Sequence, residues 1–154
     1  MANIRKGKKS DLPFILELIK ELAEYEHALD KVSITLEDLE NDGFGNSSLY
    51  WFLVAEIDSK IVGMAFYYIR YSTWEGKYLF LEDFVVTETY RNKGIGTKLF
   101  GSIIKIAKQM NMNKVMWEVL SWNTSAIQFY KKYNAQLDDE WISGKLSKEQ
   151  LDKL

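Results

Sequence analysis

The string Arg91-x-x-Gly94-x-Gly96 constrains the fold more than any other feature, because it joins a hydrophobic segment to an amphipathic one. Glycines let the backbone approach a ligand closely, and the free amides at a helix start attract anions. Lys93 and Lys98 add positive charge at the same point. The pattern therefore predicts a strand, an anion-binding turn and a helix in succession.

Two other phosphate-binding motifs do not fit this string. A P-loop needs a glycine–lysine–serine or glycine–lysine–threonine run, which is absent. A dinucleotide-binding fingerprint needs a third glycine, where this chain has Leu99. The alternative without a ligand is a glycine-softened turn that simply precedes a helix.

Hydrophobic patterning predicts the element order β-α-α-β-β-β-α-β-α-β. Strands are expected at residues 4–6, 50–57, 61–69, 78–86, 114–120 and 137–142. Helices are expected at 12–27 and 36–41, after the glycine string, and between Asn123 and Asn134, with a helical turn at 147–151. Antiparallel strands early and a strand–helix–strand unit late predict a mixed α/β (α+β) sheet with helices on both faces. Without a repeat or linker, we expect a single domain over 1–154.

Composition excludes several classes of function. The chain has 154 residues, no cysteine and one histidine, so thiolate catalysis, cysteine-based metal sites and a multi-histidine metal centre are excluded. A net charge of −2 argues against nucleic acid as a partner. The longest apolar run, residues 61–69, is about half of the ~20 residues that a membrane helix needs. With no signal-peptide pattern either, we expect a cytoplasmic protein without metal or membrane partners.

Two adjacent carboxylates, Glu82 and Asp83, lie inside an apolar strand-like run. Such groups are costly to bury unless they have a partner or a catalytic task. Neighbouring strand residues point to opposite faces, so the two can share one pocket only if a bulge redirects one of them. The alternatives are an exposed edge position or a salt bridge to an arginine.

The predicted helix after Asn123 carries the aromatic pair Phe129-Tyr130. Asn123 can cap this helix and also bind a ligand, and a tyrosine hydroxyl can donate a proton to a leaving group. The alternative is that both rings only pack in the core.

The glycine string followed by Asn-x-x-Ala-x-x-Phe-Tyr resembles the GNAT superfamily of N-acetyltransferases. A closer resemblance is to the spermidine/spermine (diamine) acetyltransferases and their thialysine-acetylating relatives, and it covers essentially the whole chain. It rests on residues 18–26, Asp42-Gly-Phe-Gly45, 61–63, Tyr67-Tyr68, Trp74-x-Gly76-Lys77, Leu81-Glu-Asp-Phe84, Tyr90-Arg91 and Trp122-Asn123.

This resemblance implies a GNAT fold, with a mixed, mostly antiparallel sheet of six to seven strands that splays at an acetyl-CoA site. It implies a homodimer that transfers acetyl directly to a primary amine. The residues implied to bind acetyl-CoA are Phe84, Val85, Val86, Arg91, Asn92, Lys93, Gly94, Ile95, Gly96, Thr97, Asn123, Thr124, Ser125 and Ala126.

The same resemblance implies catalytic roles for Glu82 and Tyr130. Glu82 matches the general base, which the chemistry needs because an amine with a pKa near ~10 is mostly protonated at neutral pH. Tyr130 matches the acid that protonates the departing CoA thiolate. Backbone amides near Phe84–Val85 would stabilise the oxyanion.

A polyamine or diamine is the first expectation for the substrate, with anions and aromatic faces spaced along a groove. The residues expected to bind it are Tyr25, Glu26, Trp74, Glu82, Asp83, Trp117 and Glu118. The side-chain amine of thialysine or another amino acid is the alternative. It would require a cation for the substrate's carboxylate, and the sequence shows none obvious near Glu82.

Two departures from the subfamily pattern stand out. Asn92 replaces a glycine, which we expect to stiffen the loop, and Trp117–Ser121 differs at the amine end, so it bears on which amine is used. A non-catalytic acyl-CoA or polyamine sensor on the same fold is a further alternative. The presence of both Glu82 and Tyr130 favours an enzyme.

Overall fold

The computed structural model describes all residues, 1–154, as two compact units, Met1–Glu118 and Val119–Leu154. The prediction of one domain over the whole chain stays a prediction. The first unit contains β1 (Asn3–Lys6), η1 (Lys9–Asp11), α1 (Leu12–Tyr25), η2 (Leu29–Lys31), α2 (Leu36–Phe44), β2 (Trp51–Ile57), β3 (Lys60–Ser72), β4 (Gly76–Val86), η3 (Glu88–Tyr90), α3 (Ile95–Gln109) and β5 (Val115–Trp117). The second contains α4 (Thr124–Lys131) and α5 (Lys148–Lys153).

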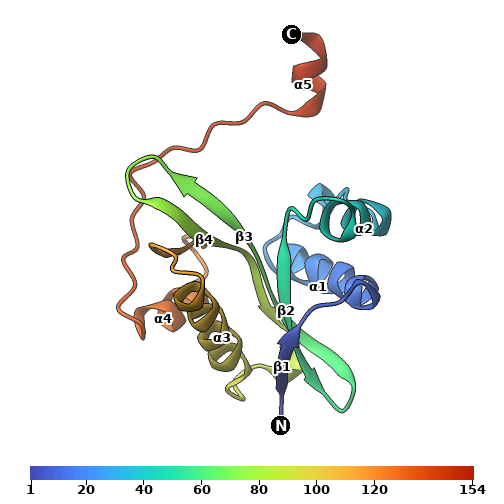
Figure 1. Cartoon of the computed structure of the whole chain (residues 1–154), viewed down its shortest axis with the longest axis vertical. Helices are drawn as coiled ribbons and strands as arrows, with labels where there is room; N and C mark the ends of the chain where they lie inside the picture. Colours follow the sequence, from blue (N-terminus) through green and yellow to red (C-terminus); the bar gives the residue numbers. More distant parts are fainter. The chain divides into compact units, whose positions relative to one another are not determined.

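The sheet has five strands in the order β1-β2-β3-β4-β5 (Figure 1). The first four strands pair antiparallel, and β5 pairs parallel to β4, so the sheet is mixed as predicted. The prediction of six to seven strands is wrong. Residues 137–142, expected as a strand, form none. Three consecutive acidic residues, 138–140, interrupt the apolar alternation that a half-buried strand requires.

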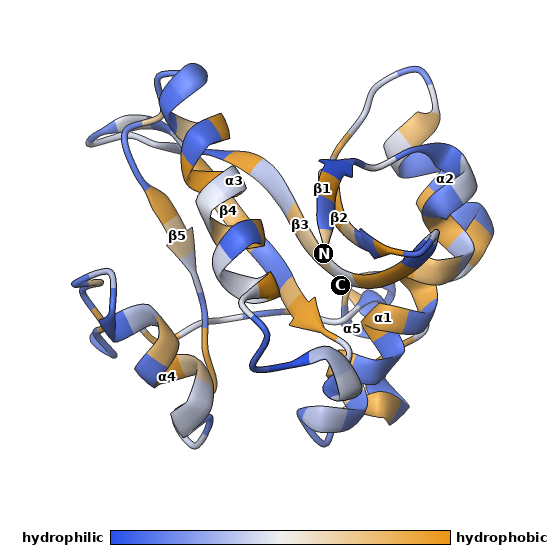
Figure 2. Cartoon of the chain, turned by 90° about the horizontal axis from the view of Figure 1, so that it is seen from below, coloured by the Kyte–Doolittle hydropathy of each residue, from blue (hydrophilic) through white to orange (hydrophobic).

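Helices cover both faces of the sheet, as the sequence predicts. In Figures 1 and 2, α1 and α2 lie on one side of the strands and α3 lies on the other. On the first side, the core is formed by residues of α1, α2 and the facing strand positions: Leu12, Ile15, Leu18, Leu39, Tyr50, Phe52, Val54, Met64 and Val85. On the second side, α3 buries Ile95, Leu99, Phe100 and Ile103. This spacing of three and four residues produces the apolar stripe that faces the sheet.

No helix in the structure has both the length and the apolar character needed to cross a membrane.

Candidate active site

The glycine string forms the connection between β4 and α3. Gly94 is the N-cap of α3 and has the left-handed φ of 77°. Asn92 also adopts a left-handed conformation, with φ of 60°. Asparagine tolerates this region better than other non-glycine residues, which explains how it can stand where a glycine was expected. The chain thus makes a tight turn that presents the first amides of α3 beside the exposed Lys93 and Lys98.

Side chains from α1 and from the loop itself hold this turn in place. Nε of Arg91 donates to the backbone oxygen of Val86 at 2.8 Å, and its guanidinium lies 5.1 Å from the centre of the Tyr25 ring. Glu21 accepts from the Thr87 hydroxyl at 3.2 Å and from the Glu88 amide at 3.1 Å. Tyr25, expected to face a substrate cation, is therefore placed against Arg91 of the loop.

Strands β4 and β5 pair over only three residues. The parallel ladder joins Leu79–Leu81 to Val115–Trp117, whereas β4 continues to Val86. Beyond Leu81, the edge of β4 that faced β5 has no strand beside it. This unpaired stretch contains Phe84, Val85 and Val86, the segment that the resemblance assigns to the pantetheine arm of acetyl-CoA.

A β-bulge lies at Glu82. Phe66 of β3 pairs with Asp83 and the next residue, Tyr67, pairs with Leu81, so Glu82 is the extra residue on β4. The bulge resets the alternation of side chains. The Tyr68 hydroxyl donates to Glu82 Oε2 at 3.3 Å, on the sheet face that also carries Asp83 and is covered by α1. The condition under which the two carboxylates can share one pocket is therefore met.

Three acidic residues meet at this point. Asp83 is half-buried, and burial raises its pKa to about 7, with the negative charges of Glu82 and Glu26 adding to the rise. Burial also raises the pKa of Glu26, at the end of α1. These groups are not arranged to hold a metal ion. We call Glu26, Glu82 and Asp83 the acidic cluster.

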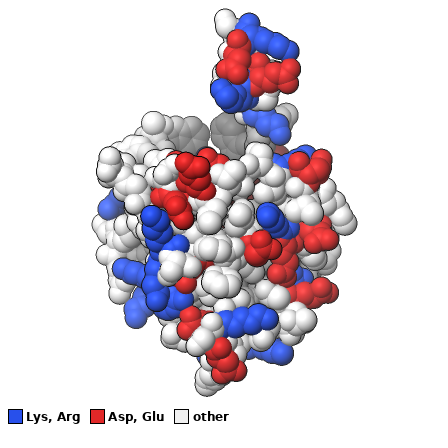
Figure 3. Space-filling view, turned by 90° about the vertical axis from the view of Figure 1, so that its right-hand side faces the viewer, with Lys and Arg blue, Asp and Glu red and all other residues white.

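Tyr68 connects the acidic cluster with two further charges. Burial raises the pKa of Tyr68, and the charges of Glu82 and Glu118 add to the rise, whereas Arg70 opposes it. Glu118 thus lies close enough to act on the same hydroxyl. Figure 3 looks onto the side that carries α1 and α2, where acidic and basic side chains are interspersed, with a group of basic ones at the left and of acidic ones at the right.

The two tryptophans expected at the substrate do not lie in the acidic cluster. Trp117 meets the Phe100 ring of α3 edge-on, with 5.5 Å between ring centres, on the face opposite the acidic cluster. Trp74 is at the tip of the β3–β4 hairpin and is 86% exposed. It precedes the start of β4 at Gly76, and Gly76 and Glu82 are separated by six residues, roughly 20 Å along an extended strand.

In the second unit, Asn123 is the N-cap of α4, as predicted. Its side-chain oxygen accepts from the Ala126 amide at 3.2 Å. Thr124 and Ser125 are exposed at the start of the helix. Tyr130 is buried, and its ring meets Phe129 edge-on at 5.4 Å. Tyr130 is therefore a buried residue of α4 in contact with an aromatic neighbour.

Sequence reasoning missed Tyr68 and Arg70. Both lie on β3, and residues two apart on a strand share a face. The signal was present in the sequence, because Arg70 is the only charged side chain within the apolar run 61–71. The same argument that singled out Glu82 and Asp83 applies to it.

Comparison with known proteins agrees with this geometry. Residues 13–135 match the acetyltransferase (GNAT) family. The chain is 42% identical to the thialysine N-epsilon-acetyltransferase of Bos taurus over 141 residues, which are 86% of this chain and 83% of that protein. It is 37% identical to the spermidine/spermine N(1)-acetyltransferase-like protein 1 of Homo sapiens, covering 96% of this chain but only 23% of that longer protein.

Among solved structures, an integron cassette protein of V. cholerae superposes with a TM-score of 0.79 at 26% identity, covering 99% of this chain and 96% of that one. The chain belongs to the GNAT family and is an acetyltransferase. Enzymes of this family take their acetyl group from acetyl-CoA.

Proposed function

We propose that this enzyme transfers acetyl from acetyl-CoA directly to a primary amine of a small molecule that carries at least two amino groups, of the polyamine or diamine type. The observation that carries the proposal is the acidic cluster beside the unpaired edge of β4. Burial raises the pKa of Asp83 to about 7, and repulsion from the nearby carboxylates of Glu82 and Glu26 adds to the rise. A bound ammonium group relieves this repulsion.

The residues present fit acetyl-CoA. The exposed turn from Arg91 to Thr97 offers helix-start amides and cations to a pyrophosphate. The edge of β4 at Phe84–Val86 offers backbone groups to the pantetheine arm. We assign a further contribution to Asn123–Ala126 at the start of α4. When bound, acetyl-CoA supplies the activated acetyl group as a thioester.

We assign the proton transfers to Glu82 and Tyr130. Glu82 is exposed and accepts from Tyr68, so it can take a proton from the incoming ammonium directly or through water. Tyr130 would return a proton to the departing thiolate. Amides near Phe84–Val85 would stabilise the negative charge on the carbonyl oxygen. Since there is no cysteine, we propose direct attack by the amine without an acyl-enzyme.

The side-chain amine of thialysine is a second candidate substrate, because the bovine relative is named for it. Thialysine and polyamines both carry ammonium groups that suit the acidic cluster. A non-catalytic sensor is the alternative from another class. We also propose assembly as a homodimer, which light scattering on the purified protein would test.

The experiment is CoA release from acetyl-CoA, followed with a thiol reagent. Because the chain has no cysteine, it contributes no background. The amines are spermidine, spermine, putrescine, thialysine, lysine and a lysine-containing peptide. We expect turnover with the small amines and little with the peptide. Silence across the whole panel, with acetyl-CoA still bound, would contradict the proposal and favour the sensor.

The variant Tyr130→Phe separates chemistry from binding. We expect kcat to fall by about 100-fold, since an acid in the transition state typically contributes at least that much, while acetyl-CoA affinity is unchanged. Tyr133→Phe, in the turn that follows α4, is the control and should keep its activity. Unchanged turnover in Tyr130→Phe would remove Tyr130 as the acid.

A further inference from the structure

Arg70 is a half-buried cation on the sheet face that carries the acidic cluster. It pairs across the strands with Tyr78, and its guanidinium carbon lies 4.4 Å from the centre of the Phe80 ring and 5.6 Å from that of Tyr78. Two aromatic rings of β4 therefore lie within cation–π distance of the guanidinium. Stacking of this kind fixes the position of a guanidinium and leaves the N–H groups at its edge available.

A nearby lysine shows what is different about Arg70. Lys114 lies 4.7 Å from the centre of the same Tyr78 ring, but its ammonium is also 2.6 Å from a carboxylate oxygen of Glu75. The structure gives the guanidinium of Arg70 ring contacts and no carboxylate. Of two cations beside one ring, Lys114 is paired with a carboxylate, whereas Arg70 forms no ion pair.

Arg70 and Glu82 lie at the two ends of a short row of side chains. Tyr68 precedes Arg70 by two residues on the same face of β3, about 7 Å away along the strand. Its ring centre is 5.4 Å from that of Phe80, on which Arg70 stacks, and its hydroxyl donates to Glu82. The two aromatic rings thus separate a free positive group from the proposed base.

This spacing suits a molecule with an amine at one end and a carboxylate at the other. A lysine-like amino acid carries its side-chain ammonium on a flexible stem of about four carbons. With that amine at Glu82, the stem can lie along the rings of Tyr68 and Phe80, and the α-carboxylate reaches Arg70. A polyamine lying the same way would bring an ammonium group toward the guanidinium, and like charges repel.

We propose that Arg70 forms a carboxylate-binding subsite, so that the preferred substrate is a free amino acid with a side-chain amine and not a polyamine. This inference rests on the acetyl transfer to a small amine proposed above, and of the two candidate substrates named there it selects the amino acid over the polyamine. It assigns to Arg70 a bidentate contact with the carboxylate, which guanidinium geometry favours.

The experiment compares each amino acid with the diamine left when its carboxylate is removed. The pairs are lysine with cadaverine, ornithine with putrescine, and thialysine with bis(2-aminoethyl) sulfide. We expect the unaltered enzyme to have the higher kcat/KM for the amino acid of each pair. In Arg70→Gln we expect that value to fall by about 10- to 100-fold, the effect of losing a charge-assisted hydrogen bond.

For the diamines, Arg70→Gln should leave kcat/KM unchanged or raise it by about two- to threefold, because a repelling charge is removed. Arg70→Lys keeps the charge without the planar fork and should lie between the two. Lys114→Gln is the matched control, and it should not change the ratio between the members of a pair. Thermal unfolding of each variant shows whether the fold is retained.

A purely structural role for Arg70 would lower both members of a pair equally, and this result would overturn the subsite. Higher activity of the unaltered enzyme with the diamines would overturn it too, while leaving the proposed acetyl transfer intact. Failure of the proposed function looks different, because the unaltered enzyme would then acetylate no member of any pair, and the subsite would fall with it.

Discussion

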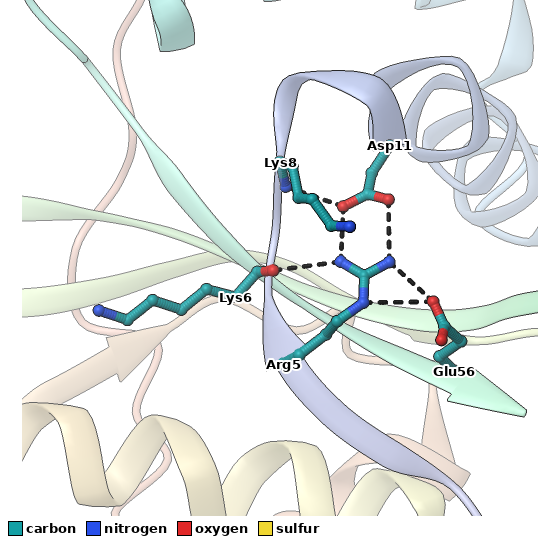
Figure 4. A network of polar contacts seen from close by, with 5 residues as sticks. All are labelled: Arg5, Lys6, Lys8, Asp11 and Glu56. Atoms are coloured by element: carbon teal, nitrogen blue, oxygen red, sulfur yellow. Dashed lines mark hydrogen bonds and ion pairs between the residues drawn. The ribbon is translucent and has the colours of Figure 1, made fainter. Parts of the chain in front are cut away.

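Asp11 is buried and Asp83 is half-buried, and the surroundings of the two carboxylates differ. Asp11 lies at the start of α1 and receives two hydrogen bonds from Arg5, at 2.8 and 3.0 Å, and one from the Lys8 amide at 2.8 Å (Figure 4). Arg5 also bonds Glu56 at 2.8 Å. Asp83 has other carboxylates as its neighbours. One aspartate belongs to a closed network of opposite charges, and the other to a group of like charges.

The pKa values of the two aspartates move in opposite directions for this reason. The hydrogen bonds from Arg5 hold the pKa of Asp11 below its ordinary value of 3.8. Burial, with Glu82 and Glu26, raises the pKa of Asp83 to about 7. The comparison shows that the buried charge of Asp11 is compensated by Arg5 at the point where β1, β2 and α1 meet. The fold leaves charge uncompensated where a cationic ligand is expected.

The largest effect is expected on catalysis, from Glu82→Gln. The neutral amide keeps the shape but cannot take a proton, so kcat/KM should fall by about 100-fold or more. The loss should be greatest at low pH, where free amine is scarcest. Steady-state rates between about pH 6 and pH 9 test this.

Glu118→Gln is the control for Glu82→Gln, since it also removes a charge that acts on Tyr68. It should affect the amine KM more than kcat. A pH response in Glu82→Gln that matches the unaltered enzyme would rule out Glu82 as the base.

The next largest effect is on stability, and it comes from a substitution that removes one charge of the network around Arg5. Asp11→Asn leaves Arg5 with a neutral partner, and we expect the free energy of unfolding at neutral pH to fall by about 2 kcal/mol. This is less than the ~3–5 kcal/mol of a fully buried pair, because Arg5 is partly exposed. The pKa of Asp11 is lowered by folding, so its contribution is present above 3.8 and is lost as the pH falls below that value.

Urea unfolding at about pH 7 and pH 3 measures this difference. Glu17→Gln, which removes an exposed ion pair with Lys20 on α1, should change stability by less than about 0.5 kcal/mol. An equal loss in both variants, or a loss that persists at low pH, would show that the network does not stabilise the fold in this way.

The smallest effect has the opposite sign and concerns Asp83→Asn. Folding raises the pKa of Asp83, so the native state gains stability from holding a proton at low pH, and this gain disappears as the pH rises from about 4 to 7. Asparagine cannot ionise. We therefore expect Asp83→Asn to be more stable than the unaltered protein by about 1–2 kcal/mol at pH 8, and nearly equal to it at low pH.

The same substitution should weaken binding of the amine, because one anion of the acidic cluster is lost. Urea unfolding at about pH 4 and pH 8, together with the amine KM, tests both expectations. Asp30→Asn, an exposed residue of η2, is the control. A stability gain that does not depend on pH would show that Asp83 stays ionised in the folded protein.

Much of the fold could be predicted because local patterns specify it. The apolar patterns of the sequence predicted β1–β5 and α1–α4. The asparagine N-cap of α4 was predicted from residue type alone. Residues 137–142 show the limit, since a few apolar residues suggested a strand that their acidic neighbours prevent. The Arg5 network joins residues 51 positions apart, and nothing in the local pattern of either residue indicates the other.

For the site, the sequence by itself determined the glycine turn, the family resemblance and the presence of carboxylates in an apolar strand. Each depends on residues close together in the chain, whose chemistry is fixed by type and spacing. Only the tertiary structure decided which carboxylates meet, because a bulge at Glu82 depends on how β3 and β4 pair. It also decided that Arg70 lies on the sheet face that carries the acidic cluster, and Trp117 on the opposite face. Side-chain direction on a strand follows from register, and register is set by contacts between distant segments.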